Sequence, residues 1–262
     1  MLSITQNFDP LLGWLLSTIV AYGRYLLFAG VAYLLFYQLW RKQSFKIQTS
    51  WPSQLRIRAE LVESAMSAVV FAAVGLLIAR AAQNGWTAIY QDLNAFGYPY
   101  LLLSFVLLAV IHDAYFYWLH RSMHSLPLLR RFHSWHHRSH NPNPLTALAF
   151  HPVEAFLEIA IILVVVLVLP LHPLVLFLFS TFSLFWNVIG HLGYEMFPAG
   201  FTSHWLGRYF NTSTHHNLHH SNGRYNFSLY FNWWDQWLGT NHPDYHQRFE
   251  AVAKQRQLKQ AP

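Results

Sequence analysis

The chain has 262 residues, of which 54% are hydrophobic and only 11% are charged. Soluble globular domains carry about 25% charged residues, so this composition excludes an ordinary soluble protein and favours one that faces lipid. The absence of cysteine excludes iron–sulfur clusters, thiolate zinc sites, disulfides and cysteine nucleophiles. The net charge of +6 suits an anionic membrane face, because the basic residues lie beside apolar runs. No nucleic-acid partner is predicted, since that would require a separate basic stripe.

Three apolar runs in the first half of the chain are long enough to cross a bilayer, at residues 11–40, 61–82 and 98–119. We read the first as a membrane span and not a signal peptide, because no Lys or Arg precedes it. The loop expected at 41–60 is basic, whereas the loop at 83–97 has no Lys or Arg. Positive charge marks cytoplasmic loops, so the segment after the third span is also predicted to be cytoplasmic.

A fourth apolar region, residues 155–189, is too long for one span. Pro170 and Pro173 divide it near the middle, and proline interrupts a helix because it lacks an amide donor and its ring collides with the preceding turn. We therefore expect a helical hairpin that enters and leaves on the cytoplasmic side. The predicted fold is an all-α integral membrane bundle of three spans plus this hairpin, with a cytoplasmic histidine-rich cap. The whole chain, 1–262, forms one membrane domain.

All 17 histidines lie between His112 and His246, and most of them fall into three clusters. Residues four apart share a helical face, so the side chains of an H-x3-H pair can reach one metal. In H-x2-H-H the last two side chains diverge enough to serve two metals. Together the three clusters are a strong signal for a metal site. The clustered histidines are His120 and His124; His133, His136 and His137; and His216, His219 and His220.

Four further residues are candidates near these clusters. His191 follows the hairpin and returns to the same membrane face, and Glu195 lies four residues beyond it as a possible ligand or supporting group. His215 precedes the third cluster and is a weaker candidate. Asp113 lies on the helical stripe of His120, where its carboxylate can accept the second ring N–H of a ligand histidine.

Eight or nine imidazoles are more than one metal ion can bind, so the pattern predicts two metals. Imidazole suits Zn, Cu, Fe and Ni, but the H-E-x-x-H motif of zinc hydrolases is absent. Two redox metals beside an apolar bundle suggest activation of O2 near a lipid chain. The alternatives are a metal transporter or metal-binding protein, which would place ligands at mid-bilayer, and a bis-histidine haem protein, which leaves most clusters unexplained.

The series H-x3-H, H-x2-H-H, H-x2-H-H resembles the signature of the fatty acid hydroxylase superfamily. This group includes sterol desaturases, sterol methyl oxidases, fatty acid 2-hydroxylases and alkylglycerol monooxygenase. The resemblance covers residues 98–245 as a catalytic region and leaves 1–97 as additional N-terminal spans. Supporting stretches lie at 112–121, 151–154, 190–191 and 234–240.

The resemblance implies an O2-dependent oxidoreductase with two iron ions that hydroxylates or desaturates an alkyl C–H bond of a lipid. It implies that the eight clustered histidines and His191 are the ligands, with Glu154 in a supporting or ligand position. Glu195 stands where the fatty acid 2-hydroxylase branch has a second histidine, which argues against that branch. Zinc is expected to replace iron in some purified samples. Electrons must come from an external reductase, ferredoxin or cytochrome, and the membrane is a bacterial inner membrane or the endoplasmic reticulum. Sterol, fatty acyl, ether-lipid and carotenoid substrates all stay open.

Overall fold

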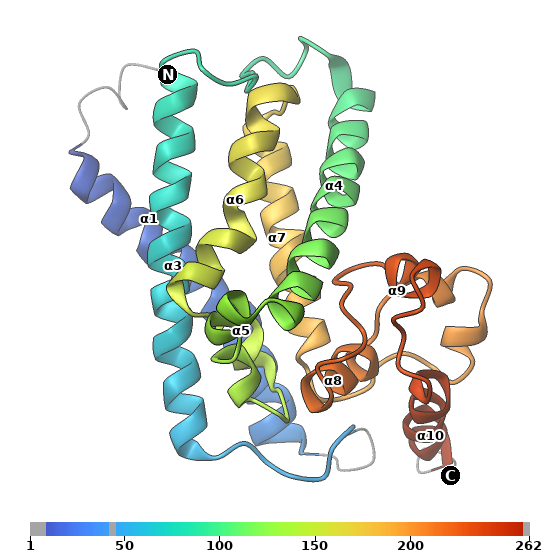
Figure 1. The fold of residues 1–262 in the computed structure, drawn as a ribbon. Coiled ribbons are helices and arrows are strands. Elements are labelled where there is room, and N and C mark those ends of the chain that lie inside the picture. Colours follow the sequence, from blue (N-terminus) through green and yellow to red (C-terminus); the bar gives the residue numbers. More distant parts are fainter. Residues whose placement is uncertain (1–8, 42–45, 259–262) are drawn as a thin grey trace.

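The computed structural model describes residues 9–41 and 46–258. The predicted all-α class is confirmed: among these residues there are only isolated β-bridges and no strand. The long helices of the bundle run side by side, and shorter ones gather at one end (Figure 1). The main helices are α1 (Pro10–Tyr25), α2 (Val31–Tyr33), α3 (Gln54–Gln83), α4 (Gly97–Ser125), α5 (Pro127–His133), α6 (Pro152–Val168), α7 (Pro173–Gly190), α8 (Ser213–Ser221), α9 (Trp233–Trp237) and α10 (Tyr245–Leu258).

Four helical stretches of the described chain are long and apolar enough to cross a membrane: Pro10–Trp40, α3, α4 and α7. The first is continuous because π-helical turns at Leu26–Gly30 and Leu34–Trp40 join α1 and α2 into one rod. It crosses the bundle obliquely and packs against α3 (Figure 1). The prediction of a multispan membrane bundle is therefore confirmed.

The basic loop expected at 41–60 is shorter than predicted, because α3 begins at Gln54. Ser53 caps this helix by accepting a hydrogen bond from the amide of Arg56, and such a cap satisfies a free amide of the first turn. The first turns of α3 are polar and extend past its apolar stretch. Arg56 pairs there with Glu60 and Glu63, which makes these charges compatible with a helix.

The helical hairpin is confirmed, with α6 ending at Val168 and α7 starting at Pro173. His172 caps α7 by accepting from the amide of Leu174, and proline is favoured at the first position of a helix. The tip of the hairpin meets the α3–α4 loop: the Ala88 amide donates to the Val166 carbonyl at 2.8 Å. The hairpin therefore extends to the end of the bundle opposite the histidine clusters.

The histidine clusters lie together at the other end of the bundle. They occupy the last turns of α4, the end of α5 and the turn that follows it, the end of α7, and α8 (Figure 1). The C-terminal part of the chain is packed against α8, where Leu218 contacts Tyr245 and Phe249 of α10. Residues far apart in the sequence are thereby fixed around one site.

Candidate metal centre

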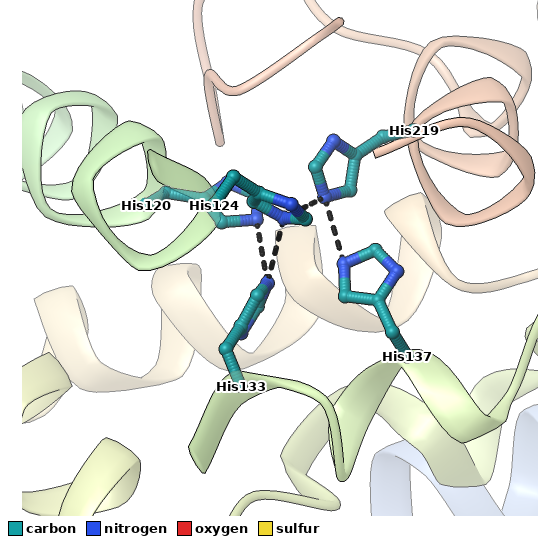
Figure 2. A group of neighbouring side chains, drawn as sticks. All are labelled: His120, His124, His133, His137 and His219. Atoms are coloured by element: carbon teal, nitrogen blue, oxygen red, sulfur yellow. Dashed lines mark hydrogen bonds between the residues drawn. The ribbon is translucent and has the colours of Figure 1, made fainter. Parts of the chain in front are cut away.

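Nine histidines form two groups of converging ring nitrogens. In each group, one nitrogen from every member lies within 4.8 Å of the corresponding nitrogens of the others. Figure 2 shows the first group, with rings from α4, from the end of α5, from the turn after α5 and from α8 pointing toward one another. The first nitrogen group consists of His120, His124, His133, His137 and His219; the second consists of His136, His191, His216 and His220.

The converging atoms are Nε2 nitrogens at short distances from one another. In the first group, His133 Nε2 lies 3.2 Å from His120 Nε2 and 3.0 Å from His124 Nε2. In the second, His191 Nε2 lies 3.0 Å from His216 Nε2 and 3.2 Å from His220 Nε2. The groups adjoin, because the rings of His137 and His220, one from each, stack with centroids 4.8 Å apart.

Five of the nine rings have their other nitrogen, Nδ1, held by an oxygen that can only accept. A carbonyl or carboxylate oxygen in this position requires the proton to be on Nδ1, and a neutral imidazole has only one such proton. Nε2 of each ring is then an unprotonated lone pair. The pairs are His120 with Phe227 O (2.8 Å), His133 with Glu154 Oε1 (2.6 Å), His191 with Asn187 O (2.8 Å), His219 with Tyr225 O (2.7 Å) and His220 with Ser139 O (2.9 Å).

These tautomers make a bound cation the simplest account of the geometry. The lone pairs of His191 and His220 face each other at 3.2 Å and cannot form a hydrogen bond. A metal ion bound at about 2.0–2.1 Å from each nitrogen places neighbouring ligand nitrogens about 3.0 Å apart at right angles. The observed spacings agree with such an arrangement, so both nitrogen groups fit a metal ion.

Burial keeps the histidines outside the spans in the neutral form that binds metals. It lowers the pKa of His191 to about 4, and it lowers that of His137 to about 3 with a further contribution from positive charge on His120. Burial and the charge of neighbouring histidines place the pKa values of His133, His216 and His220 well below the usual range. A neutral imidazole offers its lone pair without first losing a proton.

A comparison with known protein families identifies the group to which these histidines belong. The fatty acid hydroxylase family model matches residues 105–240, a stretch that includes all three clusters and His191 and covers just over half of the chain. The chain belongs to the fatty acid hydroxylase family.

The similar curated proteins within this family act on sterols by name. The chain is 33% identical to a Delta(7)-sterol 5(6)-desaturase of Gibberella zeae over 159 residues, which are 60% of this chain and 47% of the relative. It is 27% identical to the lathosterol oxidase of Homo sapiens over 216 residues, 82% of this chain and 70% of the relative. The chain thus spans about half to two thirds of the length of such relatives. No solved structure matches.

The fatty acid hydroxylase signature H-x2-H-H adopts two different backbone conformations in this chain. In α8 the last cluster is helical, as expected, so His216 and His220 share the second group while His219 turns to the first. In the middle cluster α5 ends at His133, and a 3-10 turn begins at His136. The expectation of one helical face was wrong there, although its last two side chains still diverge into separate groups.

Asp113 does not support a metal-site histidine as predicted. Its carboxylate accepts from the amide of Tyr230 and from the indole N–H of Trp233, because α4 directs it toward the C-terminal segment. Glu154, at the start of α6, occupies the position expected for Asp113, with Oε1 2.6 Å from Nδ1 of His133. This contact fixes the tautomer of His133.

Glu195 and His215 lie beside the site but outside both nitrogen groups. Glu195 accepts from the amide and the hydroxyl of Thr214, near the start of α8, so it anchors this helix. His215 points away from the groups, and its Nε2 lies 3.3 Å from the carboxylate of Asp235.

Two further acids support the site, and neither was assigned a role from the sequence, although Asp235 lies in the stretch 234–240 that resembles the family. Glu60 of α3 is fully buried and accepts from the hydroxyl of Ser139, whose carbonyl holds His220. Asp235 of α9 accepts from the amide of Phe227, whose carbonyl holds His120. Each carboxylate therefore fixes a backbone carbonyl that sets a tautomer in the site.

Gly223 lies against the first nitrogen group, where a side chain would not fit. A Cβ at this position would lie 2.7 Å from Cε1 and 2.8 Å from Nδ1 of His124. We expect Gly223→Ala to displace that ring and to weaken metal binding at the first group by about tenfold, with the second group unaffected. Metal titration of both proteins, with Gly75→Ala as a control because its Cβ meets no atom within 4 Å, tests this. Equal loss at both groups would contradict it.

Proposed function

We propose that this protein is a membrane-bound, O2-dependent di-iron oxidoreductase that desaturates or hydroxylates an alkyl C–H bond of a lipid. The observation that carries the proposal is the pair of adjoining nitrogen groups, in which lone pairs converge at 3.0–3.2 Å. Imidazole ligands accommodate iron, and zinc can occupy such sites in a purified sample. The nine histidines of the two groups are the proposed ligands.

The names of the relatives favour a sterol as the substrate class, and in particular a Δ7-sterol that is desaturated. When bound, two iron ions would activate O2, which is the oxidant of the C–H bond, and an external donor would supply the further electrons needed to reduce O2 to water. The chain orients the imidazoles through its backbone carbonyls and Glu154. Its apolar helices separate the reacting carbon from bulk water. An external reductase, ferredoxin or cytochrome is the proposed electron donor, because the sequence has no cysteine to hold a cluster.

The proposed site faces the cytoplasm, in either the endoplasmic reticulum or a bacterial inner membrane. Exposed basic side chains surround the histidine end of the bundle, including Arg130, Arg131 and Arg138, and positive charge favours the cytoplasmic side. The transporter alternative has less support, because both nitrogen groups lie at one end of the spans.

The decisive experiment combines metal analysis with product analysis on protein purified in detergent. We expect about two iron ions per chain after anaerobic loading, and conversion of a Δ7-sterol under O2 with a chemical reductant. His136→Ala combined with His219→Ala removes one member of each group and should abolish both. The matched control is His140→Ala with His246→Ala, which alters two exposed histidines outside the groups. The proposal would be refuted if the native protein folded without metal and if its metal content were unchanged by His136→Ala with His219→Ala.

A further inference from the structure

A small cavity of about 10 Å³ lies between the two nitrogen groups and the hairpin. Histidines of both groups line it, together with the rings of Phe116 and Phe150 and the side chains of Glu154, Glu158 and Asn187. A single water molecule needs about 10–15 Å³. The cavity therefore has room for one group of that size, such as a hydroxyl, and not for a lipid ring or chain.

Two of its three polar non-histidine side chains already have partners in the protein. Glu154 contacts Nδ1 of His133, and the amide of Asn187 donates to the carbonyl of Ala147. Glu158 lines the same cavity but forms no hydrogen bond or ion pair with any described residue. Its partly buried carboxyl group is thus available to whatever enters the cavity.

Glu158 lies on the membrane side of the site. Helix α6 starts at Pro152 beside the histidines and runs to the hairpin tip at the opposite end of the bundle. Glu158 follows Glu154 by four residues, which places it one turn, or about 6 Å, farther along this path on the same face. The apolar helices that are long enough to span a membrane extend on this side of the histidines.

An ionisable group at membrane depth is costly and marks a functional site by default. A carboxyl group accepts hydrogen bonds in either protonation state, so its natural partner in an aromatic cavity is a donor on the lipid. We propose that Glu158 accepts a hydrogen bond from a hydroxyl group of the substrate and selects lipids with a hydroxyl near the reacting carbon. This inference rests on the proposed function and adds to it a residue that recognises the substrate through its hydroxyl group.

The test is binding to zinc-loaded protein, which does not turn over. The probes are a Δ7-sterol with a free hydroxyl and its methyl ether, which cannot donate. We expect the native protein to bind the free sterol about tenfold more tightly, which is near the upper end of the range for one hydrogen bond between uncharged groups. Glu158→Leu should remove the preference, and Glu158→Gln should keep part of it because the amide oxygen still accepts.

Two controls separate the possible failures. Tyr115→Phe removes a nearby hydroxyl that is already bonded to the carbonyl of Leu157 and should leave the preference unchanged. Metal content should be native in Glu158→Leu, since all nine histidines remain. An equal preference in native protein and Glu158→Leu would overturn the inference, as would a variant that binds normally but turns over slowly, which would make Glu158 a proton donor. A native protein that binds no metal, or that oxidises no lipid when loaded with iron, would instead refute the proposed function.

Discussion

Asp235→Asn is expected to destabilise the protein by about 1–3 kcal/mol, the range for leaving a buried hydrogen-bond donor without an acceptor. The carboxylate is fully buried and accepts from the amides of Phe227 and Ser228 and from the Thr240 hydroxyl, and Nε2 of His215 lies 3.3 Å from it. Burial alone would raise its pKa, but His215 and these donors hold the pKa below the usual value. An amide would turn an N–H toward groups that are themselves donors.

The same substitution should weaken metal binding at the first nitrogen group by about 10–100-fold. The reason is that Asp235 fixes the segment whose Phe227 carbonyl accepts from Nδ1 of His120. Thermal unfolding with and without metal, together with metal titration, measures both effects. Asp244→Asn is the control, because Asp244 is exposed in the same part of the chain. If Asp235→Asn and Asp244→Asn had equal stability and equal metal affinity, Asp235 would not support the first nitrogen group.

Glu60→Gln is expected to destabilise the protein by about as much as Asp235→Asn. It should weaken metal binding at the second nitrogen group. The carboxylate accepts from Ser139, Asn143 and Thr146 at 2.5–2.8 Å, and these contacts tie the segment before α6 to α3. The Ser139 carbonyl in turn accepts from Nδ1 of His220. We expect metal affinity to fall about 10–100-fold at the second group, with the first group retained.

Glu63→Gln provides a matched control for Glu60. Glu63 lies about one turn farther along α3 and also pairs with Arg56, but it has no contact with Ser139. This control should lose some stability without a selective effect on either nitrogen group. The two groups can be followed separately by titrating the variants against the native protein. If Glu60→Gln lost metal equally from both groups, or from neither, the link through Ser139 would be wrong.

The sequence identified the nine converging histidines because their chemistry is carried by local spacing. Spacing did not describe how the middle cluster reaches the site: α5 ends at His133, so His136 and His137 are placed by a tight turn and not by a helical face. The membrane segments were likewise predictable from long apolar runs. The start of α3 was not, because its first turns are polar and their charges pair only in three dimensions.

The supporting carboxylates could not be assigned in the same way. Asp113 has helical spacing to His120 yet faces the C-terminal segment, whereas Glu154 reaches His133 from a different helix. Glu60 and Asp235 act through backbone carbonyls of residues 79 and 8 positions away. Such contacts depend on tertiary packing, and no periodicity within one element records them.

The order in which the chain is made restricts when the metal centre can form. The spans and the hairpin precede residue 191, but the first nitrogen group needs His219, and the second needs His216 and His220. Neither group is complete until the ribosome has synthesised α8. The membrane-embedded helices can therefore be inserted before either ion has its full set of ligands, and loading becomes a late step of biogenesis that takes place at the cytoplasmic face proposed above.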